Sequence, residues 1–145
     1  MSLEDNKTIV RAVIEEAWNK GNIAMLDTLI AADYVDHDNT IPGPDDVPAR
    51  EHAKQSVAAY RAAFPDLRMS VEAMAGEGDI VVTRWTATGT HNGPLLGVAP
   101  TGRRVSVTGM FMDRIAQGQM AESWASWDTL GLLRQLGVAP SSVPV

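Results

Sequence analysis

The sequence predicts an α+β fold in which N-terminal helices pack on one face of a mostly antiparallel sheet. Apolar residues recur at helical spacing as far as Phe64. From Leu67 onward they alternate with polar residues in long runs that are separated by turn residues. Helices followed by a meander of strands are typical of an α+β domain.

Three helices are predicted, over residues 6–20, 23–31 and 50–64. Gly21 ends the first helix, and the Pro65-Asp66 pair stops the third because proline cannot continue a helix. Between the second and third helices, residues 33–38 predict a short strand. This strand runs into a polar, proline-rich loop over residues 40–48.

Four longer strands are expected over residues 67–74, 80–90, 103–115 and 119–127. The segment His91 to Gly102 is predicted to be a loop because it holds three glycines and two prolines. A short helix should begin near Asp128. The chain is expected to be a single domain, 1–145, with a core over about residues 6–137 and a loose tail over 138–145.

Composition narrows the functional classes. The net charge of −6 and the pI near 4.9 argue against nucleic acid as a partner, because its phosphates would be repelled. No apolar run approaches the ~18 residues that predict a membrane span. The absence of cysteine excludes disulfides and thiolate catalysis and is compatible with a reducing cytoplasm, where we expect the protein. Small molecules are the expected ligands, and no cofactor is expected.

The last predicted strand, 119–127, carries the main candidate site. Counting by twos places Glu122, Trp124 and Asp128 on one face, where an aromatic residue stands between two carboxyl groups. If this face lines a pocket, Asp128 lies at its floor, where burial would raise its pKa and make it a usable acid or base. Asp128 also precedes an apolar-periodic run, so it could equally be the N-cap of a helix.

The run Asp36-His37-Asp38 has the composition of a metal site but the wrong geometry. Adjacent residues of a strand point to opposite faces, so the three side chains cannot ligate one ion, and no metal site is predicted. His37 alone has two expected roles. It is either a residue of the pocket wall, where a side chain with a pKa near neutrality can donate or accept a hydrogen bond, or a histidine bonded locally at a strand end.

At the level of motifs, the chain resembles the SnoaL-like polyketide cyclases of the nuclear-transport-factor-2-like superfamily. The segments that carry the resemblance are AADYVDHD, AFPDL, GDIVVTRWTATGTHNGPLLGVAPTGRRV and GQMAESWASWDTLGLLRQLG. The resemblance implies a cone-shaped half-barrel, in which a curved sheet wraps a deep pocket that helices close. It also implies a homodimer, a prediction that apolar residues on both sides of the long strands support.

The resemblance also implies functional residues. The cyclases use an aspartate near the end of the last strand as general acid/base in an aldol closure, and Asp128 matches that position. His37 and His91, the latter in the Gly-Thr-His-x-Gly motif, match histidines that are frequent in the family. One position departs from the pattern: where the ring-closing cyclases carry a histidine on the penultimate strand, this chain has Asp113.

The predicted function is therefore that of a cofactor-independent cyclase or isomerase, in the lyase or isomerase class, acting on an apolar carbonyl substrate. Asp128 and His37 are the predicted catalytic residues. The predicted substrate-binding residues are His91, Arg84, Trp124, Trp85, Tyr60 and Glu122. An ion pair of Arg84 with Glu122 or Glu72 and ordinary packing of the tryptophans are the structural alternatives.

Three other functions stay open. A ketosteroid-isomerase-like site would place its base near His37-Asp38, but the matching oxyanion donors are Ile14 and Phe111, which cannot donate. An epoxide-hydrolase-like site would use Arg84 and Asp128, with Thr86 in place of a second aspartate. The third is a non-catalytic module for small-molecule binding or dimerisation.

Overall fold

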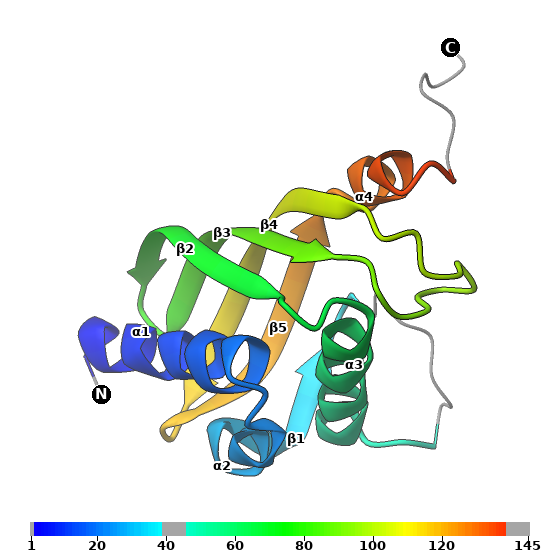
Figure 1. Cartoon of the computed structure of the whole chain (residues 1–145). Coiled ribbons are helices and arrows are strands. Elements are labelled where there is room, and N and C mark those ends of the chain that lie inside the picture. Colours follow the sequence, from blue (N-terminus) through cyan, green and yellow to red (C-terminus); the bar gives the residue numbers. More distant parts are fainter. Residues whose placement is uncertain (1, 39–45, 139–145) are drawn as a thin grey trace.

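The computed structural model describes residues 2–38 and 46–138 as one sheet with helices on one of its faces (Figure 1). Its helical elements are α1 (Leu3–Ala12), the π-helical η1 (Val13–Asn19), the 3-10 turn η2 (Ile23–Met25), α2 (Leu26–Leu29), α3 (Ala49–Ala63) and α4 (Thr129–Gln135). Its strands are β1 (Ile30–Asp36), β2 (Arg68–Glu77), β3 (Ile80–Thr90), β4 (Arg104–Ala116) and β5 (Gln119–Trp127). The predicted loop 40–48 and tail 138–145 lie mostly outside the described residues.

The sheet is mixed and open, with the strand order β1-β5-β4-β3-β2. Strands β2 to β5 form an antiparallel meander, and β1 joins it in parallel beside β5. This architecture confirms the α+β fold predicted from the sequence. Helices α1, α2 and α3 cover one face of the sheet, and α4 packs at the end of β4 (Figure 1).

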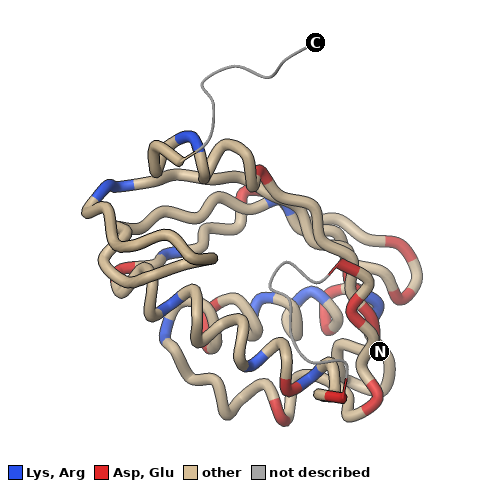
Figure 2. Tube along the Cα trace, turned by 90° about the vertical axis from the view of Figure 1, so that its right-hand side faces the viewer, with Lys and Arg blue, Asp and Glu red and all other residues tan. Residues whose placement is uncertain are grey.

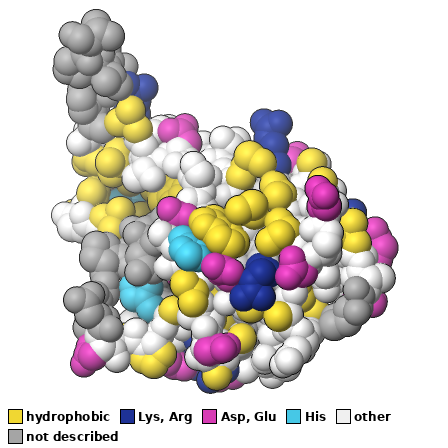
Figure 3. Space-filling model, turned by 180° about the vertical axis from the view of Figure 1, so that it is seen from behind, with side chains coloured by type: hydrophobic (Ala, Val, Ile, Leu, Met, Phe, Trp, Pro, Cys, Tyr) yellow, Lys and Arg dark blue, Asp and Glu magenta, His cyan; other side chains and the backbone are white. Residues whose placement is uncertain are grey.

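The opposite face of the sheet forms an outer surface of the molecule, on which hydrophobic side chains are exposed (Figure 3). Lysine and arginine residues are scattered among acidic ones in the described part of the chain and form no continuous basic stripe (Figure 2). Within the same residues, no helix is both long enough and apolar enough to cross a membrane.

The first helix begins earlier than predicted, because Ser2 and Asp5 form a capping box in which each side chain bonds the other's backbone N–H at 3.1 Å. The predicted helix over 23–31 is wrong at its end. It breaks into η2 and the single turn α2, and Ile30 opens β1 by pairing with Met120 of β5. A β-branched residue in contact with a strand favours the sheet over continuing a short helix.

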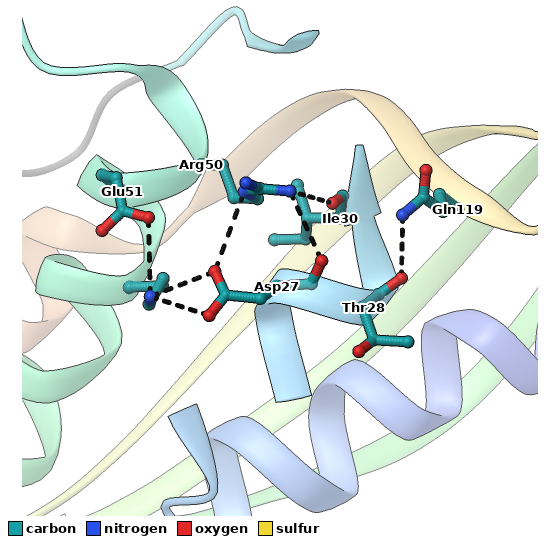
Figure 4. Close-up of polar contacts among 7 residues, drawn as sticks. Asp27, Thr28, Ile30, Arg50, Glu51 and Gln119 are labelled. Carbon is teal, nitrogen blue, oxygen red and sulfur yellow. Dashed lines mark hydrogen bonds and ion pairs between the residues drawn. The ribbon is translucent and has the colours of Figure 1, made fainter. Parts of the chain in front are cut away.

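Polar contacts fix α2 between α3 and the sheet (Figure 4). Lys54 Nζ of α3 lies 3.1 Å from both carboxylate oxygens of Asp27, and Arg50 Nη1 donates to the carbonyl oxygens of Asp27 and Ile30. On the other side, Gln119 Nε2 of β5 donates to the Thr28 carbonyl at 2.9 Å. These bonds satisfy backbone groups that so short a helix leaves open.

The end of η1 is clamped to the free edge of β2. Asn19 Nδ2 donates to the Met69 carbonyl at 2.9 Å, and Asn19 Oδ1 accepts from the Met69 N–H at 2.7 Å. The Asn19 amide thus replaces a neighbouring strand for one residue of the edge. Arg61 Nη1 of α3 donates to the Trp18 and Asn19 carbonyls, which ties the same turn to α3.

We predict that Asn19→Ala lowers the free energy of unfolding by about 2 kcal/mol, because both polar backbone groups of Met69 lose their partner in a half-buried setting. Urea denaturation measures the change. Asn22→Ala serves as the control: Asn22 is exposed and its side chain makes no cap bond, so a change within about 0.5 kcal/mol is expected. Equal effects of the two substitutions would contradict the clamp.

Candidate functional site

A cavity of about 180 Å³ lies between the helical layer and the sheet. Its walls come from α1, η1, β1, α3, α4 and the inner face of the meander, and they are mainly aliphatic and aromatic. The aromatic lining residues are Trp18, Tyr34, Tyr60, Phe64, Trp85, Phe111 and Trp127. A concave apolar site with a few polar groups is typical of small-molecule binding.

A β-bulge decides which residues of β5 face this cavity. Ile115 pairs with Met120 and Arg114 pairs with Glu122, so Ala121 is an extra residue in β5. One extra residue inverts the facing of everything beyond it. Ser123, Ala125 and Trp127 therefore line the cavity, and the prediction that Glu122, Trp124 and Asp128 line it is wrong.

Asp128 lies outside the cavity. Its side chain is exposed, and its Oδ1 accepts from the Gly131 N–H at 2.8 Å as the N-cap of α4. Gly131 leaves room for that carboxylate, into which a Cβ would collide. Of the two alternatives that the sequence left open for Asp128, the structure shows the helix N-cap. The expected location at the pocket floor is wrong.

His37, Glu122 and Trp124 form a cluster on the outer sheet face, not in the cavity. His37 Nε2 lies 2.7 Å from Glu122 Oε1, and its ring stacks on Trp124 with centroids 4.6 Å apart. Arg114 Nε donates to Glu122 Oε2 at 2.8 Å. The hydrogen bonds from Arg114 and His37 lower the pKa of Glu122. Glu122 thus pairs with Arg114 and His37 on this outer face.

Arg84 and His91 are also away from the cavity walls. Arg84 is exposed and pairs in the register with Met110, which is exposed on the outer face. His91 is fully buried, and its Nδ1 accepts from the Thr101 N–H at 3.2 Å, which holds the loop that follows β3. Neither residue is placed to touch a ligand in the cavity.

Tyr60 and Trp85 do lie in the cavity walls, where the sequence analysis expected substrate contacts. Their roles toward a substrate stay predictions. Trp85 lies opposite Gly109 in the register, and a Cβ at Gly109 would collide with the Trp85 ring and lie 2.6 Å from the Trp127 Cβ. Glycine at this position therefore leaves room for Trp85 and Trp127, which come from the strands on either side of it.

The polar centre of the cavity is Asp113 on β4. Only 2% of Asp113 is exposed, and Ser123 Oγ donates to its Oδ1 at 2.6 Å. Its Oδ2 is buried and has no hydrogen-bond partner among the described residues. Ser123 also interacts with the Tyr34 hydroxyl. The register continues this row to Asp36 on β1, which lies beside Ser123.

Burial raises the pKa of Asp113 to about 7; the hydrogen bond from Ser123 opposes that rise, and the charge of Asp36 adds to it. Burial also raises the pKa of Tyr34, so that its hydroxyl stays neutral. A carboxyl group that titrates near neutrality in a mainly apolar cavity can both take up and release a proton.

In the sequence, Asp113 was singled out only as a departure from a family pattern. A clearer signal was present: counting by twos along β4 places it in a row with the buried apolar residues Val105, Val107 and Ile115. A carboxyl group in an apolar row is rarely buried without a function or a partner.

The sequence of this chain matches a known protein family. A profile of the SnoaL-like polyketide cyclase family matches residues 8–136. No curated protein sequence matches the chain.

Several solved structures share the fold. TsrD from Streptomyces laurentii is 28% identical with a TM-score of 0.84, covering 95% of this chain and 98% of its own. AclR from Streptomyces galilaeus, a candidate hydroxylase, is 30% identical with a TM-score of 0.81, and the match covers 99% of this chain and 91% of AclR. IdmH from Streptomyces antibioticus, a candidate polyketide cyclase, is 34% identical with a TM-score of 0.78, and the match covers 92% of this chain and 99% of IdmH.

The raised pKa of Asp113 predicts a pH-dependent stability difference. Because the folded state holds this proton more tightly than the unfolded chain, the wild type should lose stability as the pH rises from about 4 to about 7. Asp113→Asn cannot ionise, so its free energy of unfolding relative to wild type should rise over that range. The upper limit of this rise in the relative free energy of unfolding is roughly 4 kcal/mol.

Urea denaturation at a series of pH values measures this difference. Ser123→Ala removes the hydrogen bond that opposes the raised pKa of Asp113, so the loss of stability should begin at the same pH but continue to a higher pH than in the wild type. A difference between Asp113→Asn and wild type that stays constant from pH 4 to pH 8 would show that Asp113 does not titrate in this range.

Proposed function

Because the chain belongs to the SnoaL-like polyketide cyclase family, we propose that it is a small-molecule cyclase or isomerase in which Asp113 is the general acid/base. The observation that carries the proposal is the buried Asp113 carboxyl group, whose Oδ2 has no partner among the described residues of a mainly apolar cavity. Asp113 thus takes the role that the family resemblance assigned to Asp128.

The chemistry requires one proton acceptor and a confined substrate. The Asp113 carboxylate takes a proton from the carbon next to a substrate carbonyl, which leaves an enolate. In a cyclase, the enolate carbon bonds to a second carbonyl carbon of the same molecule, and the new alkoxide oxygen takes the proton from Asp113. In an isomerase, Asp113 returns the proton to a different carbon. Either way Asp113 ends as it began, and no co-reactant is consumed.

The other cavity groups would orient this reaction. Ser123 holds one carboxyl oxygen of Asp113 and leaves the other for the substrate. Trp85 Nε1 is a buried donor without a hydrogen-bond partner in the described residues, so it is available to a substrate oxygen. The apolar walls exclude water and hold the reacting carbons near one another, which supplies a large part of the rate enhancement.

The epoxide-hydrolase alternative receives no support from this arrangement. It requires an arginine and two aspartates in one site, whereas Arg84 lies on the outer face and Asp128 caps α4. The binding-module alternative differs from an enzyme only in turnover, so it needs a measurement of proton transfer.

We predict that the protein catalyses deuterium exchange at the carbon next to the carbonyl of 2-tetralone, an apolar bicyclic ketone with acidic C–H bonds. In D2O, the ionised Asp113 would remove a proton and return a deuteron, and the rate should rise with pH through about 7. Asp113→Asn should lower the protein-dependent rate by about 10²-fold or more. Mass spectrometry of the recovered ketone measures the exchange.

Asp128→Asn is the matched control, because asparagine also caps helices and the residue lies outside the cavity. It should retain the wild-type exchange rate. Loss of exchange in Asp128→Asn with retention in Asp113→Asn would return the catalytic role to Asp128. No exchange by wild type, although 2-tetralone binds, would favour the non-catalytic binding module.

We also propose that the outer sheet face forms a homodimer. Figure 3 shows hydrophobic side chains exposed on this face. Val35, Met110 and Met112 are exposed, and in the register Met112 pairs with the partly buried Trp124 and Val35 pairs with Glu122. An apolar face on a sheet that helices cover only on the other side is a common protein–protein contact.

Sedimentation of the wild type at micromolar concentration should therefore give about twice the monomer mass of 15.6 kDa. Met110→Lys should shift the protein to monomers, because it places a charge in the contact. Leu96→Lys is the control, since Leu96 is equally exposed but lies in the loop after β3, and it should remain dimeric. A wild type that sediments as a monomer would overturn the dimer.

A further inference from the structure

The charges in the cavity wall all have one sign. Asp36, Asp38 and Asp113 are its only charged lining residues, and no lysine, arginine or histidine lines it in the described part of the chain. The undescribed residues 1, 39–45 and 139–145 include none of these three types in the sequence. No basic side chain from those segments can therefore balance the three carboxyl groups.

The two carboxylates near the rim are held by backbone groups. Asp38 Oδ2 accepts from the Ala125 N–H at 3.0 Å, and Asp36 Oδ1 accepts from the Asp38 N–H at 3.0 Å. Asp36 is half-buried and Asp38 is exposed. Each carboxylate is thus fixed through one oxygen, and the described residues make no other hydrogen bond to it.

Asp113 provides an independent indication of a ligand in the same cavity. It is 2% exposed, and its Oδ2 lacks any partner in the described residues. A buried polar atom without a partner costs free energy unless a ligand or solvent satisfies it. Asp36 lies close enough for its charge to act on Asp113, so the carboxyl groups at the rim and in the interior belong to one site.

Aromatic rings form part of the otherwise aliphatic cavity wall. Tyr60 and Trp127 pack edge to face with centroids 6.0 Å apart, and Tyr60 and Trp18 are also 6.0 Å apart. The faces of such rings attract cations, and ammonium groups are bound in this way in many proteins. No set of three His, Asp or Glu side chains converges as a metal site in the described residues, so an organic cation fits better than a metal ion.

We infer that the substrate of this cavity has an apolar body that bears a protonated amine, placed near Asp36 and Asp38. Anionic ligands such as carboxylates and phosphates are disfavoured, because no cation in the wall offsets their repulsion. This inference rests on the proposed function in one respect, that the same cavity holds the substrate. It adds the sign of the charge on the substrate, which the apolar walls alone do not determine.

Three probes of nearly equal shape test it: 1-naphthylmethylammonium, 1-naphthalenemethanol and 1-naphthoate. Isothermal titration calorimetry at pH 7 should show the ammonium binding about tenfold more tightly than the alcohol, and the carboxylate more weakly than both. Asp36→Asn and Asp38→Asn keep the backbone hydrogen bonds but lose the charges, and each should reduce the ammonium preference several-fold.

Glu72→Gln is the matched control. It removes one negative charge at an exposed residue of β2 that does not line the cavity, so the ammonium preference should persist. Equal affinity for the ammonium and the alcohol, or tighter binding of the carboxylate, would overturn the inference. So would an ammonium preference that survives both aspartate substitutions.

The experiments separate this inference from the proposed function. Exchange of the uncharged 2-tetralone without an ammonium preference would support the general acid/base role of Asp113 and overturn the inference that the substrate is a cation. An ammonium preference that depends on Asp36 and Asp38, with no exchange of 2-tetralone although that ketone binds, would support a cationic substrate and overturn catalysis by Asp113.

Discussion

The extra residue Ala121 in β5 determines what the cavity contains. Before the bulge, Met120 points inward and packs in the core; beyond it, Ser123, Ala125 and Trp127 point inward. Without the bulge, Glu122 and Trp124 would enter the cavity, and Ser123 would face away from it. The bulge thus brings a small hydroxyl next to Asp113 and sends Glu122 to the outer face. There Glu122 meets Arg114 and His37.

This arrangement places a carboxyl group where it destabilises the fold. Asp113 sits in an apolar row of β4, and its ionised form has one hydrogen bond, from Ser123, to offset the loss of solvent. A packed apolar residue at this position would be expected to stabilise the protein more. Retaining a titratable group here is a cost to stability of the kind that functional sites carry. The same burial is what gives the carboxyl group a pKa suited to acid/base chemistry.

Much of the fold could be predicted because its elements follow simple periodicities. The strands over residues 80–90 and 119–127 agree with β3 and β5, and the helix over 50–64 agrees closely with α3. The short α2 could not be predicted well, because contact between Ile30 and Met120 in the sheet outweighs local helix preference. Glu122, Trp124 and Asp128 were misplaced for one physical reason: counting by twos holds only in a regular strand, and no residue type in GQMAESW marks Ala121 as a bulge. Asp113 lies before any irregularity, so the same count applied to β4 identifies it.

The three carboxyl groups of the cavity also connect substrate binding to the chemistry proposed for Asp113. Burial raises the pKa of Asp113, and the charge of Asp36 adds to that rise, so both favour the neutral carboxyl group. An ammonium group bound near Asp36 would offset that negative charge and stabilise the ionised form of Asp113. The carboxylate that removes the substrate proton would then become more populated when the substrate is bound. By the same linkage, ionisation of Asp113 would tighten the binding of the cation. A wall with charges of only one sign can therefore both select a cationic substrate and prepare the base that acts on it.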